Sequence, residues 1–320
     1  MQTQAEFLSL RKHLQQAIVG QTRLMDRLML GLLTGGHVLL EGAPGLAKTT
    51  AVKALAAGVA AGFQRVQFTP DLMPSDITGS DVFDPKSTHF RFDPGPLFHE
   101  IILADEINRA PPKVQAALLE AMEERQVTVG GKTHVLPELF MVLATQNPLE
   151  QAGTYPLPEA QLDRFLFHVC IDYPSYDEEL LILQRDRNTH FGTDQKQEET
   201  PLSPALVLQA RREAAETHAE PDVERYVVSL VSATRNIGSL IPKWDGYIQT
   251  GASPRASIAL LRSACALAYI NGRDFVTPDD VMEVAVDVLR HRVIPGFKAQ
   301  ADNIDREALL QGILAEVPVP

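Results

Sequence analysis

Residues 42–49 read Gly42-Ala43-Pro44-Gly45-Leu46-Ala47-Lys48-Thr49, and this stretch predicts the fold of the first half of the chain. The short apolar run Val38–Leu40 precedes it, and a helical pattern, Thr49–Ala57, follows it. A glycine-rich turn between a strand and a helix presents backbone N–H groups and the helix N-terminus to the phosphates of a nucleotide. A turn that binds nothing is the alternative, but the lysine–threonine pair at the required offset argues against it.

The two last residues of this loop have distinct expected roles. Lys48 is expected on the β- and γ-phosphates of ATP, and the Thr49 hydroxyl on Mg²⁺. One position departs from the general pattern G-x-x-x-x-G-K-[ST], because Ala47 stands where the second glycine is usual. We expect Ala47 to lie near helical dihedrals, where a Cβ costs little.

A pair of carboxylates follows a second apolar run. Ile101–Ala104 reads as a buried strand, and Asp105 and Glu106 come directly after it. Ligands of open α/β sheets bind beyond the carboxyl ends of the strands, so these residues should face the phosphate loop. Asp105 is expected to hold Mg²⁺, through water, and Glu106 to polarise the attacking water. An ordinary strand followed by an acidic loop is the alternative, and the phosphate loop makes it less attractive.

The first part of the chain alternates apolar runs with helical patterns. Runs without polar alternation suit strands covered on both faces, which is the pattern of a parallel α/β sheet. The strand candidates are Val38–Leu40, Val66–Phe68, Ile101–Ala104, Phe140–Ala144 and Phe165–Ile171, and a helix is expected over Lys113–Glu124. Two hairpins interrupt the alternation, one around Gly130-Gly131 and one around Asp84-Pro85-Lys86. Both are short for independent stability, so we expect them to protrude from the α/β body.

The second part of the chain reads as a separate all-helical domain. Residues 187–200 are mostly polar and are expected to form a linker between a domain at 1–186 and another at 201–320. Three helix starts in the second domain pair a hydroxyl cap with proline: Ser203-Pro204, Ser253-Pro254 and Thr277-Pro278.

Four polar residues outside the loop and the acidic pair are candidates for contacts to a γ-phosphate. Asn147 follows the strand candidate Phe140–Ala144, where an amide could position water, but a turn residue before proline would look the same. Arginine supplies the permanent positive charge that phosphoryl transfer needs, and Arg109, Arg164 and Arg255 are candidates. From the residues alone, a surface ion pair is the favoured interpretation of each arginine.

Composition narrows the function classes. The chain has 320 residues, a net charge of −12 and 45% hydrophobic residues, which permits about two domains and lowers the expectation of duplex-DNA binding. Cys170 and Cys265 lie in apolar runs and are expected to be buried, and the histidines show no His-Glu-x-x-His spacing, so the sequence suggests no metal site on protein ligands alone. With no signal peptide and no run of membrane-spanning length, a cytoplasmic protein is expected.

Together these motifs resemble the MoxR family of AAA+ ATPases. The sequence motifs that carry the resemblance span nearly the whole chain: Ile18–Gln21, Glu41–Thr49, Phe68–Gly79, Leu103–Gln115, Ala144–Pro148, Tyr155–Phe165, Arg255 and Leu289–Arg292. Alanine at position 47 is usual in this family. The resemblance implies an α/β fold, an AAA+ P-loop αβα sandwich with a parallel sheet, followed by a C-terminal all-helical lid domain.

The resemblance also implies roles for particular residues. The hairpin near Asp84 looks like the helix-2 insert, and the one at Gly130-Gly131 like the pre-sensor-1 hairpin. Asn147 matches sensor 1, Arg255 matches the sensor 2 arginine, and Arg164 matches the arginine finger that reaches a neighbouring subunit's ATP. ATP would lie between the core and the lid, at a subunit interface. The residues expected at ATP are Val19, Gly20, Gly42, Ala43, Pro44, Gly45, Leu46, Ala47, Lys48, Thr49 and Thr50, and those at Mg²⁺ are Thr49 and Asp105.

At the level of function, the resemblance implies a homo-hexameric ring that hydrolyses Mg-ATP to remodel, mature or insert metal into a client protein. A partner with a von Willebrand factor A domain is expected, and nucleic acid is not. Two alternatives remain open on the sequence: a nucleotide-gated binding module with little turnover, and a DNA-remodelling AAA+ protein.

Overall fold

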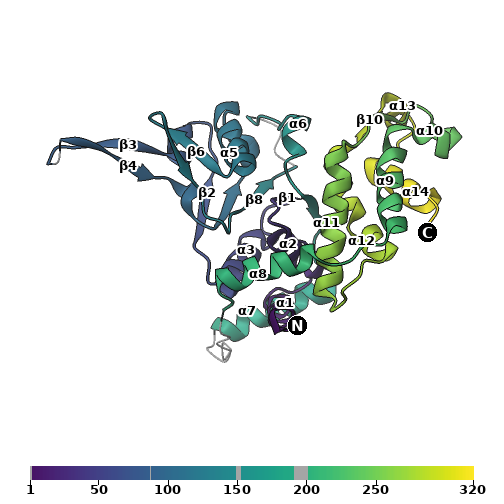
Figure 1. Ribbon diagram of the computed structural model, residues 1–320, viewed down its shortest axis with the longest axis horizontal. Coiled ribbons are helices and arrows are strands. Elements are labelled where there is room, and N and C mark those ends of the chain that lie inside the picture. The colour runs from purple at the N-terminus through teal and green to yellow at the C-terminus, as the bar shows by residue number, and fades with distance from the viewer. Residues whose placement is uncertain (1, 87, 149–152, 191–200) are drawn as a thin grey trace.

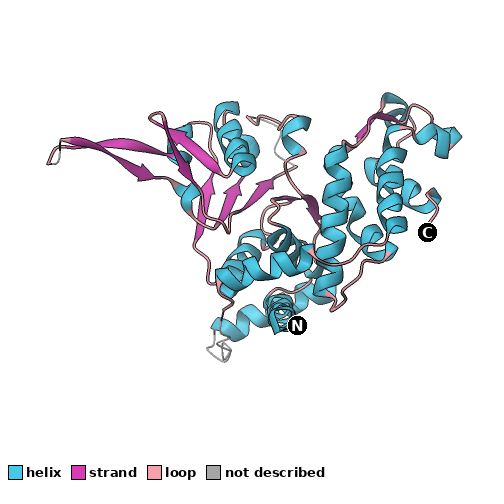
Figure 2. Cartoon of the chain, in the orientation of Figure 1, coloured by secondary structure: helices cyan, strands magenta, loops and turns pink. Residues whose placement is uncertain are grey.

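The computed structural model describes residues 2–86, 88–148, 153–190 and 201–320. A sheet with its covering helices forms the first body, and a helical bundle lies beside it (Figure 1). A long two-stranded ribbon projects from the sheet body on the side away from the bundle (Figure 2). The expected linker 187–200 begins within a helix that runs to His190, and residues 191–200 lie outside the described residues.

Within the described residues, a five-stranded sheet in the order β2-β5-β8-β1-β9 forms the core of the first body, and every neighbouring pair is parallel. Its strands are β1 (Val38–Gly42), β2 (Phe63–Gln67), β5 (Ile101–Asp105), β8 (Met141–Gln146) and β9 (Phe167–Ile171). β1 lies between β8 and β9, so the strand order reverses direction at β1. Open α/β sheets bind ligands at such a point, beyond the carboxyl ends of the strands.

Helices cover both faces of the sheet. Val38 and Leu40 of β1 pack with the helices before and after this strand, whereas Leu39 faces the opposite side, in the cluster that includes the helix after β5. The helices of this body are α1 (Gln2–Ala17), α2 (Thr22–Thr34), α3 (Lys48–Gly58), α4 (Pro74–Thr78), α5 (Pro112–Glu124), α6 (Glu159–Leu162) and α7 (Tyr176–His190), with short 3₁₀ turns at Pro96–Phe98 and Ile107–Arg109. The expected αβα sandwich with a parallel sheet is confirmed.

Both expected hairpins are present. They are β3 (Gly79–Asp84) with β4 (His89–Pro94), and β6 (Gln126–Val129) with β7 (Lys132–Val135), each pair antiparallel. Gly130 and Gly131 have positive φ, as a tight turn between twisted strands requires. The β3–β4 ribbon extends farther from the body than β6–β7 does (Figure 1).

The second body is all helical apart from one short strand pair. The chain enters it through α8 (Pro204–Ala215), which lies beside α1 and α2 of the first body (Figure 1). Its other elements are α9 (Pro221–Arg235), α10 (Ile237–Leu240), β10 (Ile248–Thr250), α11 (Pro254–Ile270), α12 (Pro278–Leu289), β11 (Ile294–Pro295), α13 (Phe297–Ala301) and α14 (Arg306–Glu316), with 3₁₀ turns at Pro242–Trp244 and Arg290–Arg292. Ser203, Ser253 and Thr277 cap their helices as expected, because each side chain accepts a hydrogen bond from a backbone N–H of the first turn. In the described ranges, no helix is long and apolar enough to cross a membrane.

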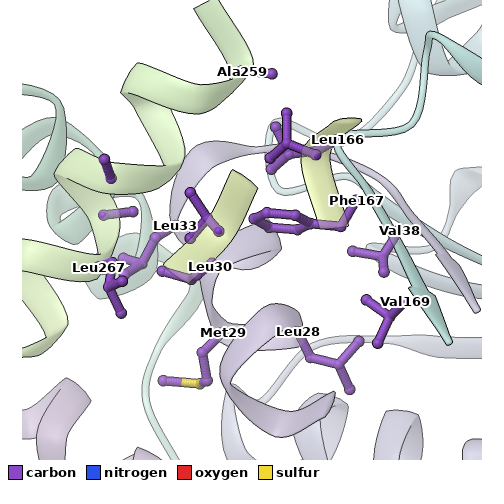
Figure 3. Close-up of a cluster of buried hydrophobic side chains, with 14 of the residues drawn as sticks. Leu28, Met29, Leu30, Leu33, Val38, Leu166, Phe167, Val169, Ala259 and Leu267 are labelled. Atoms are coloured by element: carbon purple, nitrogen blue, oxygen red, sulfur yellow. The ribbon is translucent and has the colours of Figure 1, made fainter. Parts of the chain in front are cut away.

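The two bodies share one continuous hydrophobic core (Figure 3). Phe167 of β9 and Leu30 of α2 belong to the same buried cluster as Leu267 of α11. A buried ion pair reinforces the contact: Asp287 of α12, with its side chain fully buried, accepts hydrogen bonds from Arg27 at 2.7 Å and from other arginines. A buried carboxylate with arginine partners costs several kcal/mol to unpair, so this contact fixes the relative position of the bodies.

A buried histidine joins three elements at the start of β1. The Nδ1 atom of His37 accepts a hydrogen bond from the backbone N–H of Val142 at 2.9 Å, so Nε2 carries the proton and donates to the carbonyl of Met122 at 3.2 Å. Burial lowers the pKa of His37 to about 4, and the positive charges of Arg125 and Arg211 add to this effect. Protonation would remove the acceptor that holds β8.

His37 therefore predicts a loss of stability in mild acid. Its pKa is lower in the folded chain than in the unfolded chain, so protons bind the unfolded chain more tightly and stability falls as pH falls below about 6.5. Between pH 7 and pH 5 this residue should remove roughly 2 kcal/mol from the free energy of unfolding. Urea unfolding of the wild type and of His37→Gln at both pH values tests this, since the variant keeps a donor and an acceptor but does not titrate. An equal pH dependence in the two proteins would contradict the assignment.

Candidate nucleotide-binding site

The loop after β1 has the backbone shape of a phosphate cradle. Gly42 is required because a Cβ there would lie 2.8 Å from the carbonyl oxygen of Ile171 on β9. Gly45 has φ +86°, and open space surrounds the place where its Cβ would be. Ala47 has φ 55° and ψ 17°, which is left-handed, so the expectation of near-helical dihedrals is wrong. The general pattern places glycine at this position because the turn needs a positive φ.

This loop lines one side of a pocket of about 360 Å³ at the carboxyl ends of the strands. The described residues that line it are Pro44, Gly45, Leu46, Ala47, Lys48, Thr49, Thr50, Arg65, Asp105, Glu106, Thr145 and Asn147. Lys48 lies over the loop, where its Nζ donates to the carbonyl of Gly42 at 2.7 Å. Burial lowers the pKa of Lys48, and the charges of Asp105, Glu106 and Glu41 partly offset this effect. The phosphate loop and the acidic pair thus meet in one cavity.

The Asp105 carboxylate is held from two sides. The Thr145 hydroxyl, at the end of β8, donates to Oδ1 at 2.6 Å, and Arg65 on β2 pairs with Oδ2 at 2.5 Å. Thr145 Oγ1 also accepts the backbone N–H of Glu106 at 2.9 Å. One hydroxyl therefore fixes both members of the acidic pair, because it bonds the side chain of one and the backbone of the next.

Glu106 sits in a strained backbone conformation with its carboxylate partly engaged. Its φ is 57°, in the left-handed region that costs a non-glycine residue about 1–3 kcal/mol. Gln67 Nε2 donates to Oε2 at 2.8 Å, and Arg109 Nη1 donates to the same oxygen at 3.0 Å. The carboxylate is thus aimed by side chains from two elements, which leaves its other oxygen for a water.

Arg65, Gln67 and Thr145 are site residues that the sequence reasoning missed. Arg65 and Gln67 are two residues apart on β2, so they point to the same face, and β2 pairs with β5 such that Gln67 lies opposite Asp105. Two polar side chains at this spacing in a strand beside an acidic strand end are the signal that could have identified them.

The donors in this pocket suit Mg²⁺ bound with a triphosphate. The Thr49 hydroxyl and the Asp105 carboxylate are hard oxygen ligands that both line the cavity, and Mg²⁺ favours one or two such protein ligands with phosphate and water oxygens. Arg65 holds one Asp105 oxygen, so binding of the ion through that oxygen requires the guanidinium to move. The pocket therefore fits the expected cofactors, ATP and Mg²⁺.

Arg164 and Arg255 lie elsewhere, at a second cavity of about 310 Å³. Arg164 pairs with Glu123 at 2.8 Å, and Arg255 pairs with the other oxygen of the same carboxylate at 2.7 Å. This cavity is lined by residues 35–37 before β1 and 165–166 before β9, at the amino ends of strands whose carboxyl ends carry the phosphate loop. Five residues of strand separate the two edges by roughly 16 Å.

Of the other expected site residues, Asn147 lines the phosphate pocket, whereas Val19 and Gly20 do not. Asn147 lines the pocket, as a sensor 1 residue would. Gly20 lies against Glu178 of α7, and neither Val19 nor Gly20 is among the described residues that line the pocket. No described residue of the lid lines it either, so the placement of ATP between core and lid, at a subunit interface, stays a prediction.

The left-handed Ala47 predicts a gain in stability from Ala47→Gly. The left-handed conformation costs alanine about 1–2 kcal/mol, and the extra backbone freedom of glycine offsets part of the gain. We expect the variant to be more stable by about 0.5–1 kcal/mol in urea unfolding. Ala57→Gly, on the exposed side of α3, is the matched control and should lose about as much, because Ala57 has an ordinary helical backbone. The same sign of change in both variants would contradict the reading.

Comparison with known proteins identifies the family. Residues 37–167 match the model of the ATPase family associated with various cellular activities (AAA), and residues 245–313 match the AAA lid domain. The chain is 46% identical over 310 residues to Chaperone MoxR1 of Mycobacterium tuberculosis, covering 96% of this chain and 80% of that protein. It is 34% identical over 340 residues to Protein MoxR of Paracoccus denitrificans, covering 99% and 97%. A solved structure from Cytophaga hutchinsonii superposes with a TM-score of 0.91 at 43% identity, covering 99% and 96%. This chain belongs to the MoxR family of AAA+ ATPases.

Proposed function

We propose that this ATPase works as a ring in which each Mg-ATP is hydrolysed between two subunits and the cycle remodels a partner protein. The observation that carries the proposal is the division of the catalytic groups between two edges of the sheet. The phosphate loop, Asp105 and Glu106 share one cavity, whereas Arg164 and Arg255 share another. A chain arranged in this way completes its site only with a second copy, and head-to-tail contacts of this kind close into rings.

The arrangement of the arginines supports a role in trans. Arg164 and Arg255 grip the two oxygens of Glu123, so their guanidinium groups already converge on one anion. A γ-phosphate from a neighbouring chain offers the same kind of oxygen ligands with more charge, and arginine binds such planar sets of oxygens in bidentate fashion. Arg109 is a weaker candidate for the arginine that acts in trans, because its partner Glu106 lines the nucleotide pocket of the same chain.

Hydrolysis in this proposal uses positioning and charge. Lys48 and the loop amides hold the β- and γ-phosphates, and bound Mg²⁺ would neutralise charge between Thr49 and Asp105. Glu106 accepts a hydrogen bond from the attacking water and orients it toward the γ-phosphate, and Asn147 steadies the same region. Arg164 and Arg255 of the neighbour stabilise the negative charge that develops on the transferred group.

The β3–β4 ribbon is the proposed contact to the partner protein. Phe90 is 70% exposed and Phe83 is 51% exposed, and their rings meet edge to face near the tip of the ribbon. Exposed aromatic pairs on a projecting element are typical of surfaces that bind protein. A client protein, and a partner with a von Willebrand factor A domain, belong to this proposal. Maturation or metal insertion would be the outcome for the client.

The first test removes the water-orienting carboxylate. Glu106→Gln should lower the rate of phosphate release by about 100-fold or more, because general-base catalysis contributes factors of this size. Binding of a fluorescent ATP analogue should be nearly unchanged, since the phosphate loop is intact. Glu120→Gln, on the exposed face of α5, is the matched control. Wild-type turnover in Glu106→Gln would remove this residue from its role. Negligible turnover in the wild type under all conditions would favour a nucleotide-gated binding module.

The second test asks whether the site is shared between chains. Lys48→Ala leaves Arg164 intact but cannot hold ATP, and Arg164→Ala leaves the pocket intact but supplies no arginine. Each variant alone should be nearly inactive, and an equimolar mixture assembled from dissociated subunits should recover up to about one quarter of wild-type activity. Lys48→Ala mixed with the double variant Lys48→Ala/Arg164→Ala is the control and should stay inactive. Failure of the first mixture, with mixed assemblies verified by native mass spectrometry, would argue that Arg164 acts within its own chain.

A further inference from the structure

A second cluster of metal-ligating side chains lies on the sheet outside the phosphate pocket. Glu41 of β1 is opposite Cys170 of β9 in the parallel register, and His168 lies two residues before Cys170 on the same strand. Side chains two apart on a strand point to the same face, so all three meet there. One ligand atom from each lies within 4.8 Å of the other two.

The pair formed by Glu41 and His168 is already close. The Nε2 atom of His168 is 2.7 Å from Oε2 of Glu41. The His168 side chain is 8% exposed and that of Glu41 is 31% exposed, so the cluster is mostly buried but open to solvent along the carboxylate. An ion could therefore reach it without unfolding the sheet.

Three buried polar atoms near this cluster lack a hydrogen-bond partner among the described residues. They are the Nδ1 atom of His168, the Nδ1 atom of His291 and the Nε atom of Arg306. The ring centroids of His168 and His291 are 6.0 Å apart, and the positive charge of Arg306 helps to lower the pKa of Glu41. Buried polar atoms without a partner are uncommon, and water usually satisfies them. Arg306 Nε is a donor and the His168 atom that faces Glu41 is Nε2, so these atoms indicate a polar surrounding that water can enter and are not themselves ligands of an ion.

We propose that Glu41, His168 and Cys170 form a binding site for a zinc-class divalent cation. One nitrogen, one thiolate and one carboxylate oxygen are the ligands that Zn²⁺ takes, and a water completes four-coordination. Mg²⁺ is disfavoured here, because it demands oxygen ligands in octahedral geometry. Binding displaces the thiol proton of Cys170 to solvent, and the ion inserts between the carboxylate and the ring that now form the hydrogen bond.

The charges that surround the site suit a divalent ion. Arg290 and Arg306 are positive neighbours, and Asp287 and Glu307 are negative neighbours from the lid. Arg290 is itself engaged by Asp287 at 3.0 Å and by Glu307 at 2.7 Å. With the ion bound, the Cys170 thiolate adds one negative charge to that of the Glu41 carboxylate, and the two together match the two positive charges of the ion. Without the ion, the Glu41–His168 contact is an ordinary hydrogen-bonded pair.

The position of the site suggests what the ion does. Glu41 directly precedes Gly42, the first residue of the phosphate loop, and an ion shared with His168 and Cys170 ties this point of β1 to β9. The site is thus a structural clamp beside the nucleotide pocket. It shares no residue with the Mg²⁺ ligands Thr49 and Asp105, and it does not rest on the proposed ring or its client.

The test uses Co²⁺ as a spectroscopic probe on the full chain, stripped of metal with a chelator. A thiolate-to-cobalt charge-transfer band should grow to saturation at one equivalent, and Zn²⁺ should remove it. Cys170→Ser should lose the band, whereas Cys265→Ser should keep it, because Cys265 is buried in α11 of the lid. Asp105→Asn should also keep it, which separates this site from the Mg²⁺ site.

Two further measurements keep the result interpretable. Thermal unfolding confirms that each variant is folded, and Glu41→Gln, which retains an oxygen that accepts from His168, should weaken Zn²⁺ binding. In the wild type, Zn²⁺ should protect Cys170 from alkylation as read by mass spectrometry, a readout that needs no variant. The absence of a cobalt band, a band that survives Cys170→Ser, or alkylation unchanged by Zn²⁺ would each overturn the proposal and leave only the hydrogen-bonded pair of Glu41 and His168.

Discussion

The parallel pairing of β1 with β8 on one side and β9 on the other determines where chemistry can occur in this chain. Because all five strands run in one direction, every loop that follows a strand emerges at the same edge. The phosphate loop after β1 and the carboxylates after β5 therefore meet without any further device. The same constraint places residues that precede strands, such as Arg164 before β9, at the far edge.

The lid completes this arrangement through its fixed position on the sheet. Asp287 holds Arg27 of α2 in a buried pair, and Arg292 reaches Asp163 of the core at 2.7 Å. These contacts set the start of α11, and with it Arg255, beside Glu123. Lid and core thus present Arg164 and Arg255 together, at a cavity separate from their own nucleotide pocket. Arg164 belongs to the core and Arg255 to the lid, so a motion of the lid that breaks the ion pair between Arg292 and Asp163 would separate the two arginines.

The sequence predicts the fold and the phosphate pocket well because both depend on local patterns. Unalternating apolar runs identified β1, β5, β8 and β9, and proline with a hydroxyl cap identified Ser253 and Thr277 as helix starts. The expected strand Val66–Phe68 was misplaced, because β2 covers Phe63–Gln67 and carries polar residues that hide it from such a pattern. The left-handed backbone of Ala47 was mispredicted, because one residue type cannot report the dihedral that its neighbours impose. The partners Arg65 and Gln67, and the meeting of Glu41 with His168, could not be predicted, because they depend on which strands are neighbours and in what register. Arg164 and Arg255 were identified by position in a family pattern, and only the three-dimensional structure separates them from the pocket.

Both carboxylates of the acidic pair, Asp105 and Glu106, are engaged by neighbouring side chains. Asp105 is paired with Arg65, and Glu106 is held by Gln67 and Arg109 in a strained conformation. A divalent ion with a triphosphate brings both a stronger partner for Asp105 and an anion that attracts Arg65, so nucleotide binding favours rearrangement of this network. Thr145 bonds both acids and would transmit a shift of one to the other. The position of Glu106, proposed to orient the attacking water, is therefore tied through Thr145 to that of Asp105, the proposed Mg²⁺ ligand.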